Sequence, residues 1–188
     1  QRRGGKGITG AVQKDEDFVE HLFVASTLSY LLVFTSLGRA YWLKVYEIPE
    51  SGRAARGRAL INLLNLKESE KVSAILPVRE FVEGRAILMS TKKGVVKKTE
   101  LMEFSNPRRG GVIAVSLDDD DQLIGAELTT GENDIILATA QGMSIRFDEN
   151  DVRTMGRAAR GVIGIRLDEG DYVVGMTVSS KLTVGTVS

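Results

Sequence analysis

Gly156-Arg157-Ala158-Ala159-Arg160-Gly161-Val162-Ile163-Gly164 decides the fold, because this stretch has three counterparts earlier in the chain. Its hexapeptide Gly-Arg-Ala-Ala-Arg-Gly already occurs at 52–57, and Pro107-Arg108-Arg109-Gly110-Gly111 takes the same place in a third copy. A fourth copy begins at Gly7-Ile8-Thr9-Gly10. The anchor glycines at 7, 57, 111 and 161 are 50, 54 and 50 residues apart. A repeat of this length is typical of a propeller-like or solenoid array.

Each unit contains short β-branched runs that predict strands. The first strand is expected at 112–117 in the third unit and at 163–167 in the fourth, and a second strand follows an acidic turn. A hairpin then closes the unit, with a glycine at 38, 94 or 142 to supply the positive φ of a tight turn. Only short segments such as 47–51 and 148–152 are expected to be helical. Four strands in about 50 residues is the size of a propeller blade, so we predict an all-β fold.

The whole chain, residues 1–188, is expected to form a single domain. Its repeat units run over about 7–56, 57–110, 111–160 and 161–188. The last unit is partial, because its glycine hairpin would fall beyond residue 188. The sequence therefore predicts three complete four-stranded blades and part of a fourth.

Composition limits the class of protein. A chain of 188 residues with 43% hydrophobic residues can bury a core. It has no cysteine and one histidine, His21, which excludes a disulfide framework and a cysteine-based zinc site. No stretch approaches the roughly 20 apolar residues needed to span a bilayer, and no signal-peptide core follows the basic N-terminus. We therefore expect a cytoplasmic protein without a membrane partner.

Charge is balanced in total, with 25 Lys and Arg against 25 Asp and Glu, but it alternates along each unit. Acidic residues follow the first strand of each unit, and cations precede each anchor glycine: Arg2, Arg3 and Lys6, then Arg53 and Arg56, Arg108 and Arg109, and Arg157 and Arg160. A six-residue strand would hold the two charges roughly 20 Å apart, beyond the Debye length of about 8 Å. Net neutrality thus does not exclude nucleic acid, and one basic cluster per blade predicts a track for a long polyanion.

Other conspicuous residues have ordinary interpretations. Asp118–Asp121 lacks the spacing of a calcium loop and is expected to be an acidic turn. The hairpin Lys92–Lys98 adds cations, some of which we expect to protect a strand edge. Trp42 is expected in the core, not as a platform for base stacking. The sequence shows no Walker loop or nucleophile motif, so we predict neither a catalytic nor a metal site.

The first seven residues, Gln1-Arg2-Arg3-Gly4-Gly5-Lys6-Gly7, combine three cations with three glycines. Arginine offers a planar fork of donors, and glycine lets main-chain N–H groups approach an anion closely. This chemistry favours a loop that holds phosphate. A solvated, charged terminus without a ligand is the alternative.

The same heptapeptide matches the gyrase A box, so the chain resembles the C-terminal domain of the DNA gyrase A subunit, part of a bacterial type IIA topoisomerase. Two further segments, 41–49 and 156–161, also resemble that family. The resemblance implies a β-pinwheel, a propeller-like disc whose neighbouring blades exchange strands. It also implies that duplex DNA wraps around the basic rim in a positive sense and so supports ATP-dependent negative supercoiling.

By this resemblance, Gln1, Arg2, Arg3 and Lys6 would contact DNA while Gly4, Gly5 and Gly7 shape the loop. The other rim contacts would be Arg53, Arg56, Arg108, Arg109, Arg157 and Arg160. The partners would be double-stranded DNA, the N-terminal part of the gyrase A subunit and the gyrase B subunit, at the nucleoid. The chain itself would hold no active site and no cofactor, since ATP and Mg²⁺ would bind elsewhere in the enzyme.

Two other functions remain open at this stage. The A-type subunit of topoisomerase IV has a related domain that generally lacks an intact box. A propeller that binds proteins would share the four-stranded blades, but its Gly-His and Trp-Asp signatures or paired glycines are absent from the repeat positions of this sequence.

Overall fold

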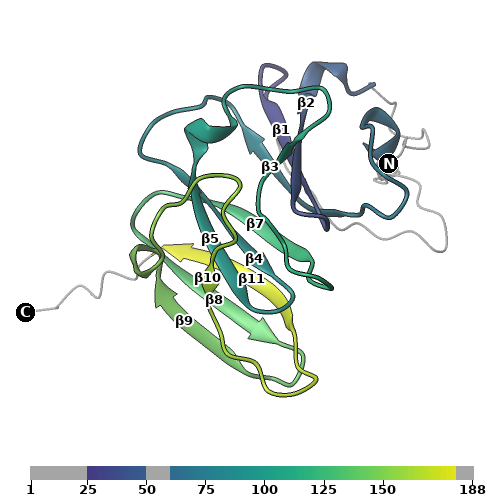
Figure 1. Ribbon diagram of the computed structural model, residues 1–188. Coiled ribbons are helices and arrows are strands. Elements are labelled where there is room, and N and C mark those ends of the chain that lie inside the picture. Colours follow the sequence, from purple (N-terminus) through teal and green to yellow (C-terminus); the bar gives the residue numbers. More distant parts are fainter. Residues whose placement is uncertain (1–24, 50–59, 181–188) are drawn as a thin grey trace, which may run out of the picture.

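The computed structural model describes residues 25–49 and 60–180, and these residues form three antiparallel sheets (Figure 1). The first sheet has the order β3-β1-β2-β6, the second β10-β5-β4-β7 and the third β11-β8-β9. Within the described ranges the only helices are short 3-10 turns, which agrees with the predicted all-β fold. None of these helices is long and apolar enough to cross a membrane.

The strands are short, as expected for propeller blades. Their bounds are β1 Tyr30–Thr35, β2 Arg39–Lys44, β3 Val72–Val78, β4 Ala86–Thr91, β5 Val95–Glu100, β6 Val112–Ile113, β7 Leu123–Thr129, β8 Asn133–Thr139, β9 Ser144–Asp148, β10 Val162–Ile163 and β11 Val173–Ser180. The 3-10 helices are η1 Val45–Glu47, η2 Leu60–Leu63, η3 Leu101–Phe104 and η4 Glu149–Asp151.

Each sheet takes strands from more than one sequence unit. The first sheet joins the hairpin β1-β2 to β3 of the next unit and to β6 of the unit after that, and the second sheet repeats this pattern with β4-β5, β7 and β10. The third sheet has the hairpin β8-β9 and β11, but no strand pairs with the outer edge of β9 within the described residues. Blades that exchange strands in this way form a β-pinwheel, so the predicted fold class is confirmed.

The sheets have an inner and an outer edge. Strand β7 contacts both β3 and β11, so these three strands form the inner side where consecutive sheets meet. Strands β6 and β10 lie at the opposite edge of their sheets, next to β2 and β5. The loops that lead into β6 and β10 therefore reach these strands at the outer edge.

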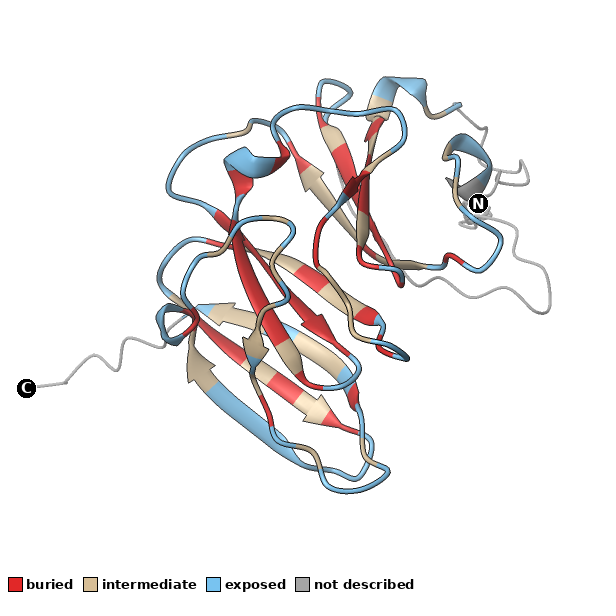
Figure 2. Ribbon diagram, viewed as in Figure 1, coloured by how far each residue is buried: buried red, intermediate tan, exposed pale blue. Residues whose placement is uncertain are grey.

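The core lies between consecutive sheets, and β4 contributes to both of its halves. Ile87 and Met89 pack with Phe34 and Leu32 of the first sheet, whereas Leu88 belongs to the cluster shared with the third sheet. All six residues of β4 are buried, which fits the continuous apolar run in its sequence. Figure 2 shows this strand in red and β9 largely in pale blue.

The predicted hairpin turns are present, and their glycines have positive φ: 71° at Gly38, 85° at Gly94 and 87° at Gly142. At Gly94, in the second sequence unit, the fourth unit also passes close to the turn. A Cβ atom there would lie 2.7 Å from the carbonyl oxygen of Ile165. At Gly142, in the third sheet, no atom of the described residues lies within 4 Å of that position.

In the third and fourth units the first strand is much shorter than predicted. Only Val112–Ile113 and Val162–Ile163 are strands, instead of 112–117 and 163–167. After β6 the chain bends over the hairpin tip of the first sheet, where the N–H groups of Ala114 and Val115 both donate to the carbonyl of Gly38. Ala114 and Val115 are buried between blades. Their apolar pattern therefore serves packing and not pairing within a sheet.

The prediction that some hairpin lysines protect a strand edge is wrong for β5. Lys97 and Lys98 are buried, with 1% and 7% of their surface exposed. Strand β5 is not an edge strand, because β10 pairs with it through Val162 and Val96. Each ammonium group is instead hydrogen-bonded to main-chain carbonyls of other segments.

Candidate nucleic-acid interface

Four of the predicted rim arginines lie within the described residues, and they fall in two loops. The loop 107–111 leads into β6 and carries Arg108 and Arg109, and the loop 156–161 leads into β10 and carries Arg157 and Arg160. Gln1–Gly7, His21, Arg53 and Arg56 lie outside the described residues, so their predicted roles stay predictions. Because β6 and β10 occupy the same place in consecutive sheets, the structure brings the two basic loops to equivalent positions at the outer edge.

The anchor glycines set these loops close to the strand beneath them. Gly111 has a φ of 70°, and a Cβ atom there would lie 2.7 Å from the Tyr41 ring. Gly161 has a φ of 102°, and a Cβ atom there would lie 2.5 Å from the carbonyl oxygen of Val96. Both the backbone angle and the available space thus favour glycine at these positions.

Side chains of the strands below hold both loops. Arg39 of β2 donates to the carbonyl of Gly110 at 2.7 Å and to the hydroxyl of Tyr41 at 3.2 Å. Lys97 of β5 donates from Nζ to the carbonyls of Ala114, at 2.6 Å, and Arg157. Tyr41 and Lys97 each stand three residues after a hairpin glycine, so the same place in two blades supports the basic loop through different chemistry.

Burial changes the proton affinity of both supports. The Lys97 ammonium is desolvated and lies near the Arg157 guanidinium, and these effects lower its pKa to about 8 despite the opposing influence of Glu103. Desolvation also raises the pKa of the Tyr41 hydroxyl, which donates to Oε2 of Glu70 at 3.0 Å. Glu70 is itself 1% exposed and accepts from the Thr35 hydroxyl at 2.5 Å. These buried polar groups tie the hairpin to the following unit.

The arginines differ in exposure. Arg108, Arg109 and Arg160 are exposed, whereas Arg157 is only partly accessible, with 27% of its side chain exposed. An exposed guanidinium is available to a phosphate of a bound polyanion. A partly buried one acts in a lower dielectric, where its interaction with a phosphate is stronger.

The predicted separation of basic and acidic groups is wrong for the fourth basic cluster. Arg160 forms an ion pair with Asp118, which follows the first strand of the preceding unit. Nε of Arg157 lies 3.8 Å from Oε2 of Glu103. The reason is the packing of consecutive units: Ser116 donates from N–H and hydroxyl to the carbonyls of Ala159 and Ala158, which places the acidic turn beside the basic loop.

The acidic turns themselves have a structural role. Asp121 is 8% exposed, and its Oδ1 accepts from the N–H groups of Lys93 and Gln122 at 2.9 and 2.8 Å. Asp171 accepts in the same way from Gln141 and Tyr172 in the third sheet. Across residues 25–49 and 60–180 no group of three or more His, Asp or Glu side chains could hold a metal ion. The hydrogen bond from the N–H of Asp121 to the carbonyl of Asp118 closes the predicted acidic turn at Asp118–Asp121.

Trp42 agrees with its predicted place in the core. It packs against the cluster between the first two sheets, and its indole N–H donates to the carbonyl of Phe104 at 2.8 Å. The ring is therefore committed to the packing between blades and is not a free platform for stacking.

Sequence reasoning missed two residues of the outer edge, Arg39 and Glu103. Both line a groove between the two basic loops, together with Arg108 and Arg157. The repeat contained a signal for Arg39, because the residues directly after the other hairpin glycines are Val95 and Met143. A cation at a repeat position that is apolar in the other units indicates a function specific to that unit.

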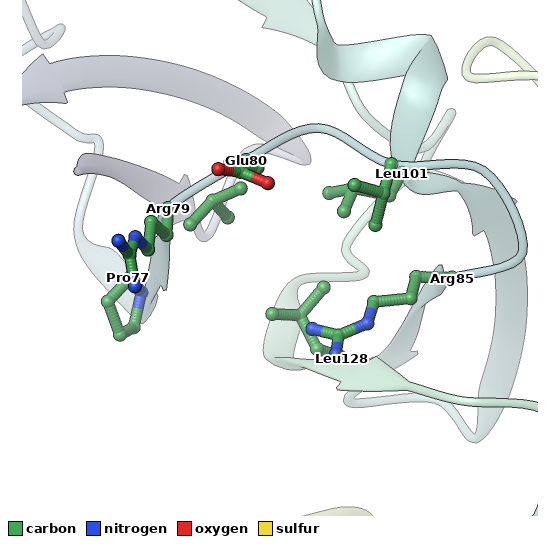
Figure 3. A pocket seen from close by; sticks show the side chains of 8 residues that line it. Pro77, Arg79, Glu80, Arg85, Leu101 and Leu128 are labelled. Carbon is green, nitrogen blue, oxygen red and sulfur yellow. The ribbon is translucent and has the colours of Figure 1, made fainter. Parts of the chain in front are cut away.

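Two further arginines lie in a different pocket. Figure 3 shows Arg79, Glu80 and Arg85 around a pocket that Pro77, Leu101 and Leu128 also line. Arg79 and Arg85 come from the connection between β3 and β4, and β3 belongs to the inner side of its sheet. This pocket does not coincide with the basic loops, and its arginines provide a comparison for those at the outer edge.

Comparison with known proteins supports the pinwheel. A family model described as "DNA gyrase C-terminal domain, beta-propeller" matches residues 1–26, 29–79, 86–130 and 133–180, four successive stretches that cover most of the chain. The chain belongs to the family of DNA gyrase C-terminal domains. The last three of these stretches each begin with a hairpin, β1-β2, β4-β5 or β8-β9. They end with an inner strand, which is β3, β7 or β11.

Relatives of this gyrase C-terminal domain include A subunits of DNA gyrase. The chain is 52% identical over 178 residues to the subunit of Salmonella typhimurium and 51% identical over 178 residues to that of Escherichia coli, which is 95% of this chain and 20% of either relative. It is 49% identical over 164 residues to the subunit of Clostridium acetobutylicum, 87% of this chain and 20% of that relative. The chain thus spans about a fifth of the length of these relatives.

Two solved structures share the fold of this gyrase C-terminal domain. The C-terminal domain of DNA topoisomerase IV matches with a TM-score of 0.75 and 32% identity, over 82% of this chain and 48% of that one. A DNA gyrase A C-terminal domain matches with a TM-score of 0.69 and 24% identity, over 90% of this chain and 56% of that one. Gyrase and topoisomerase IV domains therefore share this strand-exchanged architecture.

Proposed function

We propose that this chain binds duplex DNA and wraps it around the outer edge of the pinwheel, as the DNA-wrapping part of a gyrase. The observation that carries the proposal is the placement of two basic loops at equivalent positions of consecutive sheets, each ahead of an outer strand. Arg108, Arg109 and Arg160 are exposed there. Duplex DNA carries phosphates at a constant spacing along its length. Arginines that recur at equivalent positions of successive sheets can therefore contact it repeatedly.

The energetics of wrapping are consistent with contacts to phosphate. Bending a site of 20 to 30 base pairs by 40 to 90° costs roughly 1–6 kcal/mol. Each neutralised phosphate releases counterions and contributes about −0.9 to the slope of log affinity against log salt concentration. Within the described residues the two basic loops offer arginines, and neither loop contains a helix or strand that could enter a DNA groove. The proposed binding is therefore to the DNA backbone, with little sequence preference.

The N-terminal heptapeptide Gln1–Gly7 would set the sense of the wrap, as its match to the gyrase A box implies. Arg2, Arg3 and Lys6 would then control chirality more than affinity, because the other basic clusters remain. The wrap would let the N-terminal part of the A subunit and the B subunit, with ATP and Mg²⁺, introduce negative supercoils in the cytoplasm. The chain itself would be non-catalytic.

The test is a titration of linear duplex DNA at several salt concentrations, followed by ligation of nicked circles that reads the sign of trapped supercoils. Replacing Arg108, Arg109 and Arg160 by Gln should lower both affinity and the steepness of its salt dependence. Replacing Arg79 and Arg85 by Gln removes two positive charges away from the basic loops and is the control, compared per charge removed. Equal losses in both variants, or binding that barely changes with salt, would contradict a DNA track along these loops.

A second candidate is the role of the topoisomerase IV domain, favoured by the 32% identity and TM-score of 0.75 to that solved structure. The two roles give different ligation results. DNA binding with trapped positive supercoils supports the gyrase role, and binding without them supports the topoisomerase IV type. Failure to bind DNA at all would favour a propeller that binds proteins.

A further inference from the structure

A groove of about 560 Å³ separates the two basic loops at the outer edge. Arg108 and Gly111 line it from the first loop, and Gly156, Arg157 and Ala158 from the second. Arg39 of β2, Glu103 of η3 and the outer strand β6 complete the lining. A polyanion that passes from one basic loop to the next must cross this groove.

The groove holds three guanidinium groups and one carboxylate, so its lining carries a net positive charge. Arg157 is the central group: its Nε is buried and makes no hydrogen bond to any described residue. The closest acidic atom, Oε2 of Glu103, is 3.8 Å away, which is beyond hydrogen-bonding distance. A buried donor without an acceptor is unusual in a folded protein. The accessible part of the Arg157 side chain, 27% of its surface, is what an anion in the groove would contact.

The loop carbonyls, which would repel a phosphate, are already engaged. The carbonyl of Gly110 accepts from Arg39 and that of Arg157 accepts from Lys97. The carbonyls of Ala158 and Ala159 accept from Ser116. Those of Arg108 and Gly156 accept from the loops' own N–H groups. Six main-chain acceptors are therefore occupied by protein donors. The guanidinium groups then dominate the electrostatic interaction of the groove with an anion.

From this arrangement we propose that the groove is a phosphate-binding subsite for the DNA backbone, formed by Arg39, Arg108 and Arg157, in which the Glu103 carboxylate competes with the phosphate for Arg157. The proposal rests on the proposed DNA wrapping and adds where the duplex is held between two blades. It also assigns an opposing role to Glu103, whose side chain is 51% exposed and free to give way.

The test measures affinity for a linear duplex of random sequence against salt, in wild type, Arg157→Gln, Glu103→Gln and the double variant. Loss of one phosphate contact should reduce the salt slope by about 0.9, which is about 3.5-fold in affinity between 50 and 200 mM salt. Glu103→Gln should tighten binding several-fold when Arg157 is present. In the double variant this gain should disappear.

Matched controls come from the pocket at the inner side, where Arg79 and Glu80 are both exposed. Arg79→Gln and Glu80→Gln make the same changes in net charge away from the groove. If the groove variants behave like these two, the subsite is refuted while DNA wrapping stands. If the wild type shows no salt-dependent binding, the proposed function itself fails.

Folding is checked separately by circular dichroism and thermal unfolding of each variant. Should Arg157→Gln fail to fold, Arg108→Gln replaces it, because the Arg108 side chain is exposed and makes no hydrogen bond to a described residue that holds the loop. A folded Arg108→Gln with an unchanged salt slope, together with a Glu103→Gln that gains no affinity, would overturn the proposal.

Discussion

Replacing Lys97 by Met should change how the stability of the protein depends on pH. The Lys97 side chain is almost fully buried, and desolvation and Arg157 lower its folded-state pKa to about 8 from 10.5. Between these two values the unfolded chain binds more protons than the folded one, so the free energy of unfolding rises with pH. Met has a similar volume but no titratable group, and the variant should lack this rise.

The size of the effect follows from the two pKa values. Integrating the difference in proton binding between pH 7.5 and pH 9.5 gives a rise of about 2 kcal/mol in the wild type relative to Lys97→Met. At neutral pH the variant loses two hydrogen bonds and also a desolvated charge, and these two losses affect stability in opposite directions.

The assay is urea unfolding of both proteins at the two pH values, followed by tryptophan fluorescence of Trp42, which packs against the core. The relevant quantity is the difference in unfolding free energy between the proteins, because all other titrating groups cancel in it. A difference that stays constant within about 0.5 kcal/mol would refute a depressed Lys97 pKa, given the usual error of extrapolation. Arg157→Gln should make the rise smaller, because it removes a charge that lowers the pKa.

Three further outcomes can be measured by unfolding or by DNA titration. Gly94→Ala should cost more stability than Gly142→Ala, by about 1–3 kcal/mol, because both have positive φ but among the described residues only the first Cβ would meet a carbonyl oxygen; equal losses would contradict the packing of the fourth unit, through Ile165, over the Gly94 turn. Glu70→Gln should cost about 1–3 kcal/mol, since it weakens a buried acceptor of three donors, and an unchanged midpoint would argue against that network. Asp118→Asn should tighten DNA binding several-fold by releasing Arg160, with little change in stability because the pair is exposed, and weaker binding would contradict the competition.

Much of the fold could be predicted because its signals are local. A tight hairpin needs a residue that tolerates positive φ, and the glycines at 38, 94 and 142 meet this need. They predict the hairpins whichever sheet the strands join. The buried run of β4 is apolar without alternation, as expected for a strand packed on both faces. The predicted positions of the basic clusters at the outer edge also agree with the structure for Arg108, Arg109 and Arg160.

The length of the first strands and the fate of the lysines could not be predicted in the same way. A run such as Val112–Leu117 has the same apolar, β-branched pattern whether it pairs in a sheet or bends over a neighbouring turn to pack between blades. Lys97 resembles an edge lysine until β10, from 65 residues further along the chain, covers that edge. Which strand pairs with a given edge depends on contacts between distant segments, and the residues of that edge alone do not predict it.

The sequence by itself determined the repeat, the hairpins, the all-β class and the placement of a cation before each anchor glycine, because these depend on backbone angles and short-range patterns. Only the tertiary structure decided which units share a sheet and how far one unit is offset from the next. That offset brings Asp118 to Arg160 and Glu103 to Arg157, and it gathers Arg39 with the basic loops around one groove. The charges were visible in the sequence, but their partners depend on distances between units that only packing sets.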